Sequence, residues 1–201
     1  IGPEYGGKIF YHQSSGNVGK FHLKLAFDDG SVLTIRLTSM GVIQALKDEE
    51  LDRSYVYKRD FSGPPSSLDE GFTFNRFSKD IAAENRMLKS LLVGKDAVVI
   101  GLSNSAFQDV IYRAGLHPKR KGSELNVSQR RALYDAVMLV VQDRLKLGGK
   151  TQFQDLYGQH GSYIPAMGSN MKEKNCINCG TLIEKIAVGG GQTYYCPNCQ
   201  R

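Results

Sequence analysis

The chain has 201 residues, of which 41% are hydrophobic and 23% are charged, so it can bury one good core, or two smaller cores and a metal-held appendage. No apolar run, residues 97–100 among them, approaches the roughly 20 residues of a membrane span. Residues 1–8 lack the basic-then-apolar pattern of a signal peptide. The composition therefore excludes a protein built from membrane-spanning helices and favours an ordinary globular one.

The net charge of +6 is unevenly distributed along the chain. Residues 1–100 carry 13 Lys and Arg against 13 Asp and Glu, whereas residues 101–201 carry 13 against 7. A basic half beside a neutral half indicates a polyanionic partner, either nucleic acid or an anionic surface. A surplus that only aids solubility is the alternative.

The first 60 residues have the pattern of antiparallel sheet. Apolar residues alternate with polar or small ones over 20–27 and again over 33–37, and Asp28-Asp29-Gly30-Ser31 supplies a turn between them, which predicts a β-hairpin. We expect an earlier strand at 8–11 and a third strand at 41–46.

Beyond 62–67, a Ser-, Gly- and Pro-rich stretch typical of a linker, the period becomes helical between Phe77 and Leu92. A short helix is expected over 104–114, because Gly115 and Pro118 follow it as helix terminators.

A long helix should begin after Asn126, with Gln129 completing a capping box, and end at Gly148-Gly149. Its apolar stripe comprises Leu133, Val137, Val140, Val141 and Leu145. Residues 150–171 have the composition of a loop.

All four cysteines lie in the last 26 residues, as Cys176-x-x-Cys179 and, after 16 residues, Cys196-x-x-Cys199. Two such knuckles bring two sulfurs each to opposite sides of a tetrahedron, which predicts one structural Zn²⁺ bound by Cys176, Cys179, Cys196 and Cys199. Four thiolates leave the ion no open position for chemistry, but they would hold a hairpin between Ile183 and Tyr195 rigid. Two disulfides in a secreted protein are the alternative.

A series of short motifs, in order along the chain, resembles the formamidopyrimidine-DNA glycosylase and endonuclease VIII family. The resemblance is nearest to a bacterial endonuclease VIII-like branch. It comprises Gly101-Leu102-Ser103-Asn104, Gln108-Asp109, residues 114–120, Gly148-Gly149, residues 155–158, Gly161-Ser162-Tyr163 and the four cysteines. Residues 22–30 and Met40-Gly41 resemble later strands of that family's first domain more loosely.

The resemblance implies an α+β fold: a truncated antiparallel β-sandwich domain, then a helix–two-turn–helix domain with a C-terminal four-cysteine zinc finger. The corresponding boundaries are 1–61 for the remnant of the β-rich domain, 62–71 for a linker, 72–171 for the helical domain and 172–201 for the zinc finger.

Candidate DNA-binding residues gather around the expected helix at 104. Gly101 leads into a helix amino terminus, whose free N–H groups and dipole attract phosphate, and Asn104 can both cap the helix and donate a hydrogen bond. In the family the matching asparagine contacts the DNA backbone; capping alone is the alternative. The resemblance also places Lys89 near the damaged nucleotide, although a helix lysine is commonly just solvated.

Two departures from the family pattern bear on chemistry. In the family an amino-terminal proline amine attacks the sugar as nucleophile, with an adjacent glutamate, but this chain opens with Ile1-Gly2, so we expect no catalytic residue in it and interpret it as processed, trimmed or part of something longer. Pro3-Glu4 is interpreted as coincidence. Where many relatives carry a hairpin arginine this chain has Gly191, and the adjacent Gln192 can donate to a phosphate but adds no charge.

The resemblance implies a base-excision repair protein, a DNA glycosylase with or without AP-lyase activity that acts on oxidised bases in duplex DNA, of which this chain is the DNA-binding part. The implied partner is double-stranded DNA with a damaged base or an abasic site, bound by a monomer in the bacterial cytoplasm at the nucleoid. A non-catalytic, zinc-dependent DNA-binding relative is the first alternative, and a zinc-stapled interaction module is the second.

Overall fold

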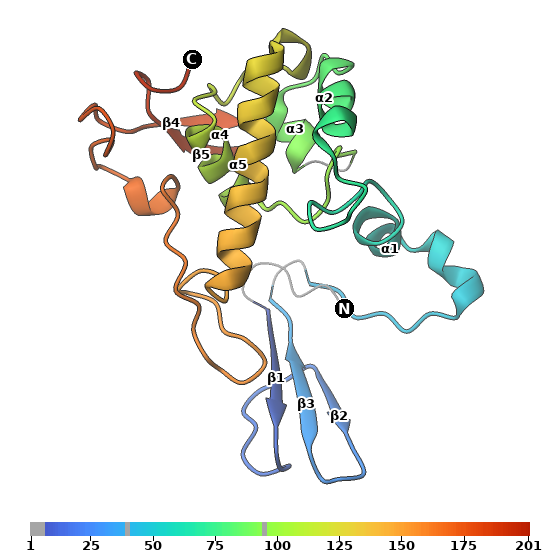
Figure 1. Cartoon of the computed structure of the whole chain (residues 1–201). Helices are drawn as coiled ribbons and strands as arrows, with labels where there is room; N and C mark the ends of the chain where they lie inside the picture. Colours follow the sequence, from blue (N-terminus) through green and yellow to red (C-terminus); the bar gives the residue numbers. More distant parts are fainter. Residues whose placement is uncertain (1–6, 39–40, 94–95) are drawn as a thin grey trace. The chain divides into compact units, whose positions relative to one another are not determined.

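The computed structural model describes residues 7–38, 41–93 and 96–201 (Figure 1). The chain divides into two compact units. One contains the residues up to Val56 together with Arg144–Ile164, and the other contains Tyr57–Asp143 together with Pro165–Arg201. Ile1, Pro3, Glu4 and Met40, which the sequence singles out, lie outside the described residues. None of the described helices is long and apolar enough to cross a membrane.

The first unit contains an antiparallel sheet of strands β1 (Lys8–His12), β2 (Leu23–Ala26) and β3 (Val32–Arg36), in the order β1-β3-β2. The predicted hairpin is confirmed: Gly30 adopts a positive φ of 83° in the turn, and the Ser31 amide donates to Asp29 Oδ1 over 2.9 Å. The strand expected at 8–11 is β1, whose Tyr11 amide donates to the Leu156 carbonyl at 2.8 Å.

The prediction of a third strand at 41–46 is wrong. Within the described chain, this segment forms an isolated bridge at Val42 and then continues without regular structure to the 3-10 helix η1 (Asp48–Arg53). Val42 and Ile43 are adjacent and do not alternate, so the segment has no single apolar face to bury. A short apolar run without a partner ladder does not make a strand.

The second unit is helical and carries the zinc hairpin. Its helices and the helix that leads into it are α1 (Tyr55–Asp60), α2 (Phe74–Ala82), α3 (Leu88–Leu92), α4 (Asn104–Arg113), η2 (Gly122–Glu124), α5 (Val127–Lys146) and η3 (Ser169–Met171). The hairpin strands are β4 (Glu184–Val188) and β5 (Gly191–Tyr195). The predicted helical stretch between Phe77 and Leu92 is thus two helices, α2 and α3, with a break over 83–87.

An apolar core joins α2, α3, α4 and α5. Its largest fully buried side chains are Phe77, Ile81, Leu88, Leu91, Leu92, Phe107, Ile111, Leu116 and Leu133. They come from α2, α3, α4 and α5 and from the segment after α4, so the core fixes where α3 and α4 lie with respect to each other.

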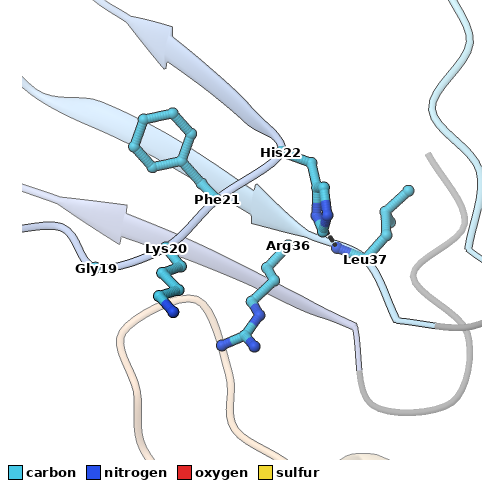
Figure 2. A pocket seen from close by; sticks show the side chains of 6 residues that line it. All are labelled: Gly19, Lys20, Phe21, His22, Arg36 and Leu37. Atoms are coloured by element: carbon cyan, nitrogen blue, oxygen red, sulfur yellow. Dashed lines mark hydrogen bonds between the residues drawn. The ribbon is translucent and has the colours of Figure 1, made fainter.

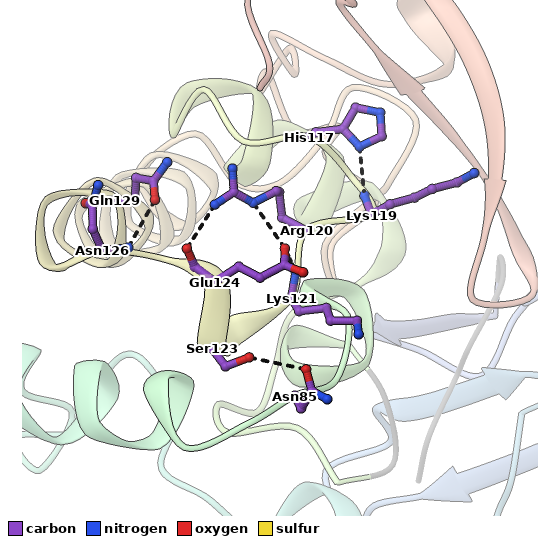
Figure 3. A network of polar contacts seen from close by, with 9 residues as sticks. All are labelled: Asn85, His117, Lys119, Arg120, Lys121, Ser123, Glu124, Asn126 and Gln129. Atoms are coloured by element: carbon purple, nitrogen blue, oxygen red, sulfur yellow. Dashed lines mark hydrogen bonds and ion pairs between the residues drawn. The ribbon is translucent and has the colours of Figure 1, made fainter.

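The long helix α5 begins as the sequence predicts. The Gln129 amide donates to Asn126 Oδ1 at 2.9 Å, and the Asn126 amide donates to Gln129 Oε1 at 3.0 Å, which completes the capping box (Figure 3). Of the predicted stripe, Leu133, Val137 and Val140 are buried, and Val141 packs at the edge of the core. Leu145 is 60% exposed and lies in the last turn of α5, which belongs to the other compact unit.

Gly122 is where the backbone of η2 approaches the end of α2 most closely. A Cβ at this position would lie 2.3 Å from the Ile81 carbonyl oxygen and 2.9 Å from that of Glu84, and both are backbone atoms that cannot swing aside. Gly71 offers a matched comparison, because a Cβ there would meet only the flexible end of Arg76, at 3.8 Å.

We therefore expect Gly122→Ala to lower the free energy of unfolding by about 3 kcal/mol through overpacking, measured by urea denaturation. The control Gly71→Ala should change it by less than about 0.5 kcal/mol. Equal effects of the two substitutions would contradict this packing of η2 on α2.

Candidate nucleic-acid interface and zinc module

The four cysteines come together as predicted. Their sulfur atoms all lie within 4.8 Å of one another, with 3.8 Å between Cys176 and Cys199 and 3.5 Å between Cys179 and Cys196. Tetrahedral zinc with Zn–S bonds of about 2.3 Å requires sulfurs about 3.8 Å apart, whereas a disulfide requires about 2.05 Å. The donor set therefore fits one structural Zn²⁺, and the disulfide alternative fails.

Backbone geometry shapes the first knuckle. Gly180 has a φ of +72°, and its amide donates to the Cys176 carbonyl at 2.8 Å, which closes the turn that points Cys176 and Cys179 the same way. The Cys199 amide lies 3.4 Å from Cys196 Sγ in the second knuckle. With four thiolate ligands, the zinc ion stabilises the fold and has no open position for substrate.

The hairpin β4–β5 connects the two knuckles, which confirms the hairpin expected between Ile183 and Tyr195. Its register runs from Glu184 opposite Tyr195 to Val188 opposite Gly191, and the turn consists of Gly189 and Gly190, with φ values of +50° and +74°. Glycines in the left-handed region allow a two-residue turn of this tightness.

Lys89 of α3 reaches the tip of this hairpin. Its Nζ donates to the Val188 carbonyl over 2.5 Å, and the residue is only 7% exposed. A Cβ on Gly191 would lie 2.9 Å from Lys89 Nζ, and one on Gly189 would lie 3.3 Å from Lys89 Cδ. Lys89 can therefore lie against the tip because Gly189 and Gly191 carry no side chain.

Asn104 approaches the same tip from α4. Its Nδ2 approaches the Gln192 carbonyl at 3.4 Å and lies 3.9 Å from where a Cβ on Gly191 would be. Its Oδ1 is buried without a hydrogen-bond partner among the described residues.

The expectation that Asn104 caps the helix is wrong. Ser103 is the N-cap of α4 and accepts from the Ala106 amide at 3.2 Å, so Asn104 is the first helical residue. Because a serine hydroxyl already satisfies the free amide, the asparagine side chain is released from capping and points to the hairpin.

The other two candidates are more exposed. Gly101 has a φ of +89° and open space around it, and it precedes α4 by three residues. Gln192 contributes its carbonyl to the contact with Asn104, while the residue itself is exposed on β5. The structure thus brings Lys89, Asn104, Gly191 and Gln192 together and places Gly101 near them in sequence only.

Within the part of the chain that the structure describes, no acidic group pairs with the charge of Lys89. Burial removes water from its ammonium group and lowers its pKa below the ordinary value. No carboxylate of the described residues forms an ion pair with it. A desolvated cation beside an amide N–H donor is an arrangement that favours an anion.

Sequence comparison gives this geometry a family. The H2TH domain of formamidopyrimidine-DNA glycosylase matches residues 63–155, and the zinc finger found in that glycosylase and in isoleucyl-tRNA synthetase matches residues 174–201. A formamidopyrimidine-DNA glycosylase of Streptococcus pneumoniae is 32% identical over 200 residues, which cover 97% of this chain and 72% of the relative. The chain belongs to the formamidopyrimidine-DNA glycosylase family.

Further relatives agree with this assignment. A formamidopyrimidine-DNA glycosylase of Bacillus cereus is 29% identical over 199 residues, covering 96% of this chain and 71% of the relative. A solved structure of Lactococcus lactis Fpg in complex with DNA containing an abasic site superposes with a TM-score of 0.81 at 25% identity, over 97% of this chain and 72% of that one. The α+β fold with antiparallel sheets, an H2TH domain and a zinc finger is thereby confirmed.

Two further polar surfaces were missed by sequence reasoning. In the glycosylase family's H2TH region, residues 117–121 form a basic loop in which Arg120 pairs with Glu124 at 3.3 Å and the Lys119 amide donates to His117 Nδ1 at 3.2 Å (Figure 3). In the first unit, Lys20, Phe21, His22 and Arg36 line a shallow open pocket beside β3 (Figure 2). The basic Lys119-Arg120-Lys121 run was the available signal for the first surface.

We expect the purified chain to contain one zinc ion, measured by elemental analysis. Cys179→Ser should lose the ion, because three thiolates and a hydroxyl bind zinc far more weakly, whereas Asn178→Ser, in the same knuckle, should keep it. Chelation should loosen residues 172–201 before the helical core. Zinc well below one equivalent, or a mass showing cystine bridges, would contradict the assignment.

Proposed function

We propose that this chain is the DNA-binding part of a base-excision repair DNA glycosylase that acts on duplex DNA with an oxidised base or an abasic site. Family membership supports the enzyme class, and the complex of Lactococcus lactis Fpg with abasic-site DNA supports the ligand. The observation that carries the proposal is the uncompensated Lys89 ammonium beside Asn104 Nδ2 at the glycine tip of the zinc hairpin.

The proposed ligand of this cluster is a phosphate of the DNA backbone. The Lys89 ammonium has three N–H groups, of which one is used by the Val188 carbonyl, so others remain for a phosphate oxygen. Asn104 Nδ2 adds a neutral donor, and its 3.4 Å contact with the Gln192 carbonyl is long enough to be exchanged for a better acceptor. Gly101 and the Gln192 side chain are proposed as flanking contacts.

Such a cluster positions DNA without reading its sequence. Phosphate contacts fix register and orientation, and the zinc-held hairpin keeps the donors rigid so that little entropy is lost on binding. An extruded nucleotide needs its flanking backbone held in this way, because unstacking it costs a few kcal/mol.

We further propose that the protein acts as a monomer on chromosomal DNA at the nucleoid.

For DNA binding, we expect Lys89→Met to weaken affinity for a duplex with an abasic-site analogue about 10-fold at low salt, measured by fluorescence anisotropy. It should also reduce the slope of log affinity against log salt by about 0.9, because one phosphate contact is lost. Asn104→Ala should weaken binding to all sequences alike and leave the slope nearly unchanged, since it removes a neutral donor.

Lys79→Met on α2 is the matched control, since it removes the same charge from an exposed position. An equal loss of affinity and slope in this variant would show that general charge, and not the hairpin cluster, attracts the DNA. An affinity of Lys89→Met equal to that of the parent chain would contradict the assignment of the cluster.

Covalent chemistry at this cluster is a separate question, because an amine nucleophile must be free to attack the sugar. Lys89 is 7% exposed and its Nζ donates to the Val188 carbonyl inside the packed tip, so we propose that it binds a phosphate through its remaining N–H groups and does not reach the sugar to form a Schiff base. A polypeptide of residues 1–201 should then bind abasic duplex but yield no borohydride-trapped adduct, as resolved on denaturing gels. An adduct that Lys89→Met abolishes would overturn this role and make Lys89 the nucleophile.

A further inference from the structure

Three side chains spaced four residues apart form a polar row along α4. Each contacts the zinc module, which comprises residues 174–201. Asn104 Nδ2 approaches the Gln192 carbonyl at 3.4 Å. Gln108 Oε1 accepts from the Tyr194 amide at 2.8 Å. The Tyr112 hydroxyl lies 3.1 Å from Cys176 Sγ. Residues four apart share one face of a helix, so the row is a continuous seam between α4 and the module.

The seam continues after the helix ends. Gln200, which is 2% exposed, donates from Nε2 to the Leu116 carbonyl at 2.8 Å and accepts from the Cys196 amide at 2.9 Å. The Arg201 amide also donates to the Gly115 carbonyl at 3.0 Å. The first knuckle is therefore docked on α4 through Tyr112, and the second is docked through Gln200 on the segment that follows α4.

Tyr112 is the member of the row that touches a metal ligand. Its ring is 6% exposed and packs in a small core with Met167, Met171, Ile183 and the buried cysteines. A zinc-bound cysteine is a thiolate and carries no proton, so the hydroxyl must be the donor of this contact.

We propose that Tyr112 is a positioning residue of the zinc site: its hydroxyl donates to the Cys176 thiolate, strengthens zinc binding and ties the occupancy of the metal site to the docking of the hairpin on α4. Zn²⁺ with four thiolates carries two net negative charges, the Cys176 and Cys196 ligands are buried, and a donated hydrogen bond offsets part of that charge. Outer donors of this kind change metal affinity by roughly 10- to 100-fold.

A functional consequence, which rests on the proposed function, follows from the geometry of the row. Asn104, at the amino end of α4, lies at the proposed phosphate site, and Tyr112, two turns along the same face, lies at the metal. Loss of zinc would release the module from the seam and remove the Gln192 and Val188 carbonyls from Asn104 and Lys89. The hairpin grip on DNA thus depends on metal loading.

The test uses Tyr112→Phe in the full zinc-loaded chain, with Tyr134→Phe as matched control, because the Tyr134 hydroxyl donates to the Phe72 carbonyl at 3.0 Å in the helical core. Competition with a chromophoric chelator should show zinc binding at least about 10-fold weaker in Tyr112→Phe and unchanged in the control.

A second readout reports on the sulfur itself. In the Co²⁺-substituted chain, loss of the hydrogen bond raises the energy of the Cys176 lone pairs, so the sulfur-to-cobalt charge-transfer band should move to longer wavelength in Tyr112→Phe and stay in place in Tyr134→Phe. Incorporation of 3-fluorotyrosine at position 112, a stronger donor of the same shape, should move the band to shorter wavelength.

Unchanged zinc affinity in Tyr112→Phe would overturn the proposal. Weaker zinc binding with an unmoved band would also overturn it, since the effect would then come from packing alone. If Tyr112→Phe fails to fold, the fluorotyrosine chain decides by the direction of its shift. None of these readouts involves DNA. The role of Tyr112 can therefore be contradicted while the proposed DNA binding holds, and DNA binding can be contradicted while the role of Tyr112 holds.

Discussion

The docking of the zinc module against one face of α4 is the contact on which the rest of the site depends. The four-thiolate site makes residues 174–201 a rigid body, but rigidity alone does not place the hairpin tip. The placement comes from contacts at four-residue intervals, from Asn104 through Gln108 and Tyr112 to the Leu116 carbonyl. Because α4 is itself held by Phe107, Val110 and Ile111 in the helical core, the core determines where the tip lies.

The same docking creates an electrostatic cost. Lys89 is buried under the glycine tip, and among the described residues its partner is a carbonyl and not a carboxylate. Desolvation of an ammonium disfavours folding unless an anion approaches. A phosphate bound next to the ammonium would offset this desolvation energy. Glycine at 191 belongs to the same arrangement, because a side chain there would displace the ammonium. The positive charge next to the hairpin tip thus belongs to Lys89 of α3 and not to a residue of the hairpin.

Local patterns predicted much of the fold. The hairpin at 20–37, the capping box at Asn126, the end of α4 near Gly115 and the metal site were all read from residues close together in sequence, since each depends on a turn, a cap or a knuckle that is complete within a few residues. The errors arose where partners are distant or compete locally. The segment 41–46 had strand-like residues but no ladder to join, and Ser103 outcompeted Asn104 for the cap because it stands one residue earlier.

The candidate site was predicted as a set of residue types but not as a geometry. Lys89 and Val188 are 99 positions apart, so no periodicity could show that an α3 lysine would lie against the hairpin tip. Gln108 is recognisable from the sequence only as part of a motif, and Tyr112 lies inside an apolar run that has the pattern of a core segment. Its hydroxyl becomes meaningful only once Cys176 is known to lie beside it.

A crystal structure of the zinc-loaded chain with a duplex that contains an abasic-site analogue tests the central claim most directly. The account predicts a backbone phosphate whose oxygens lie within about 3.2 Å of both Lys89 Nζ and Asn104 Nδ2, with the hairpin still docked on Gln108 and Tyr112. A complex in which the phosphates pass elsewhere, and Lys89 Nζ keeps the Val188 carbonyl as its sole partner, would contradict it.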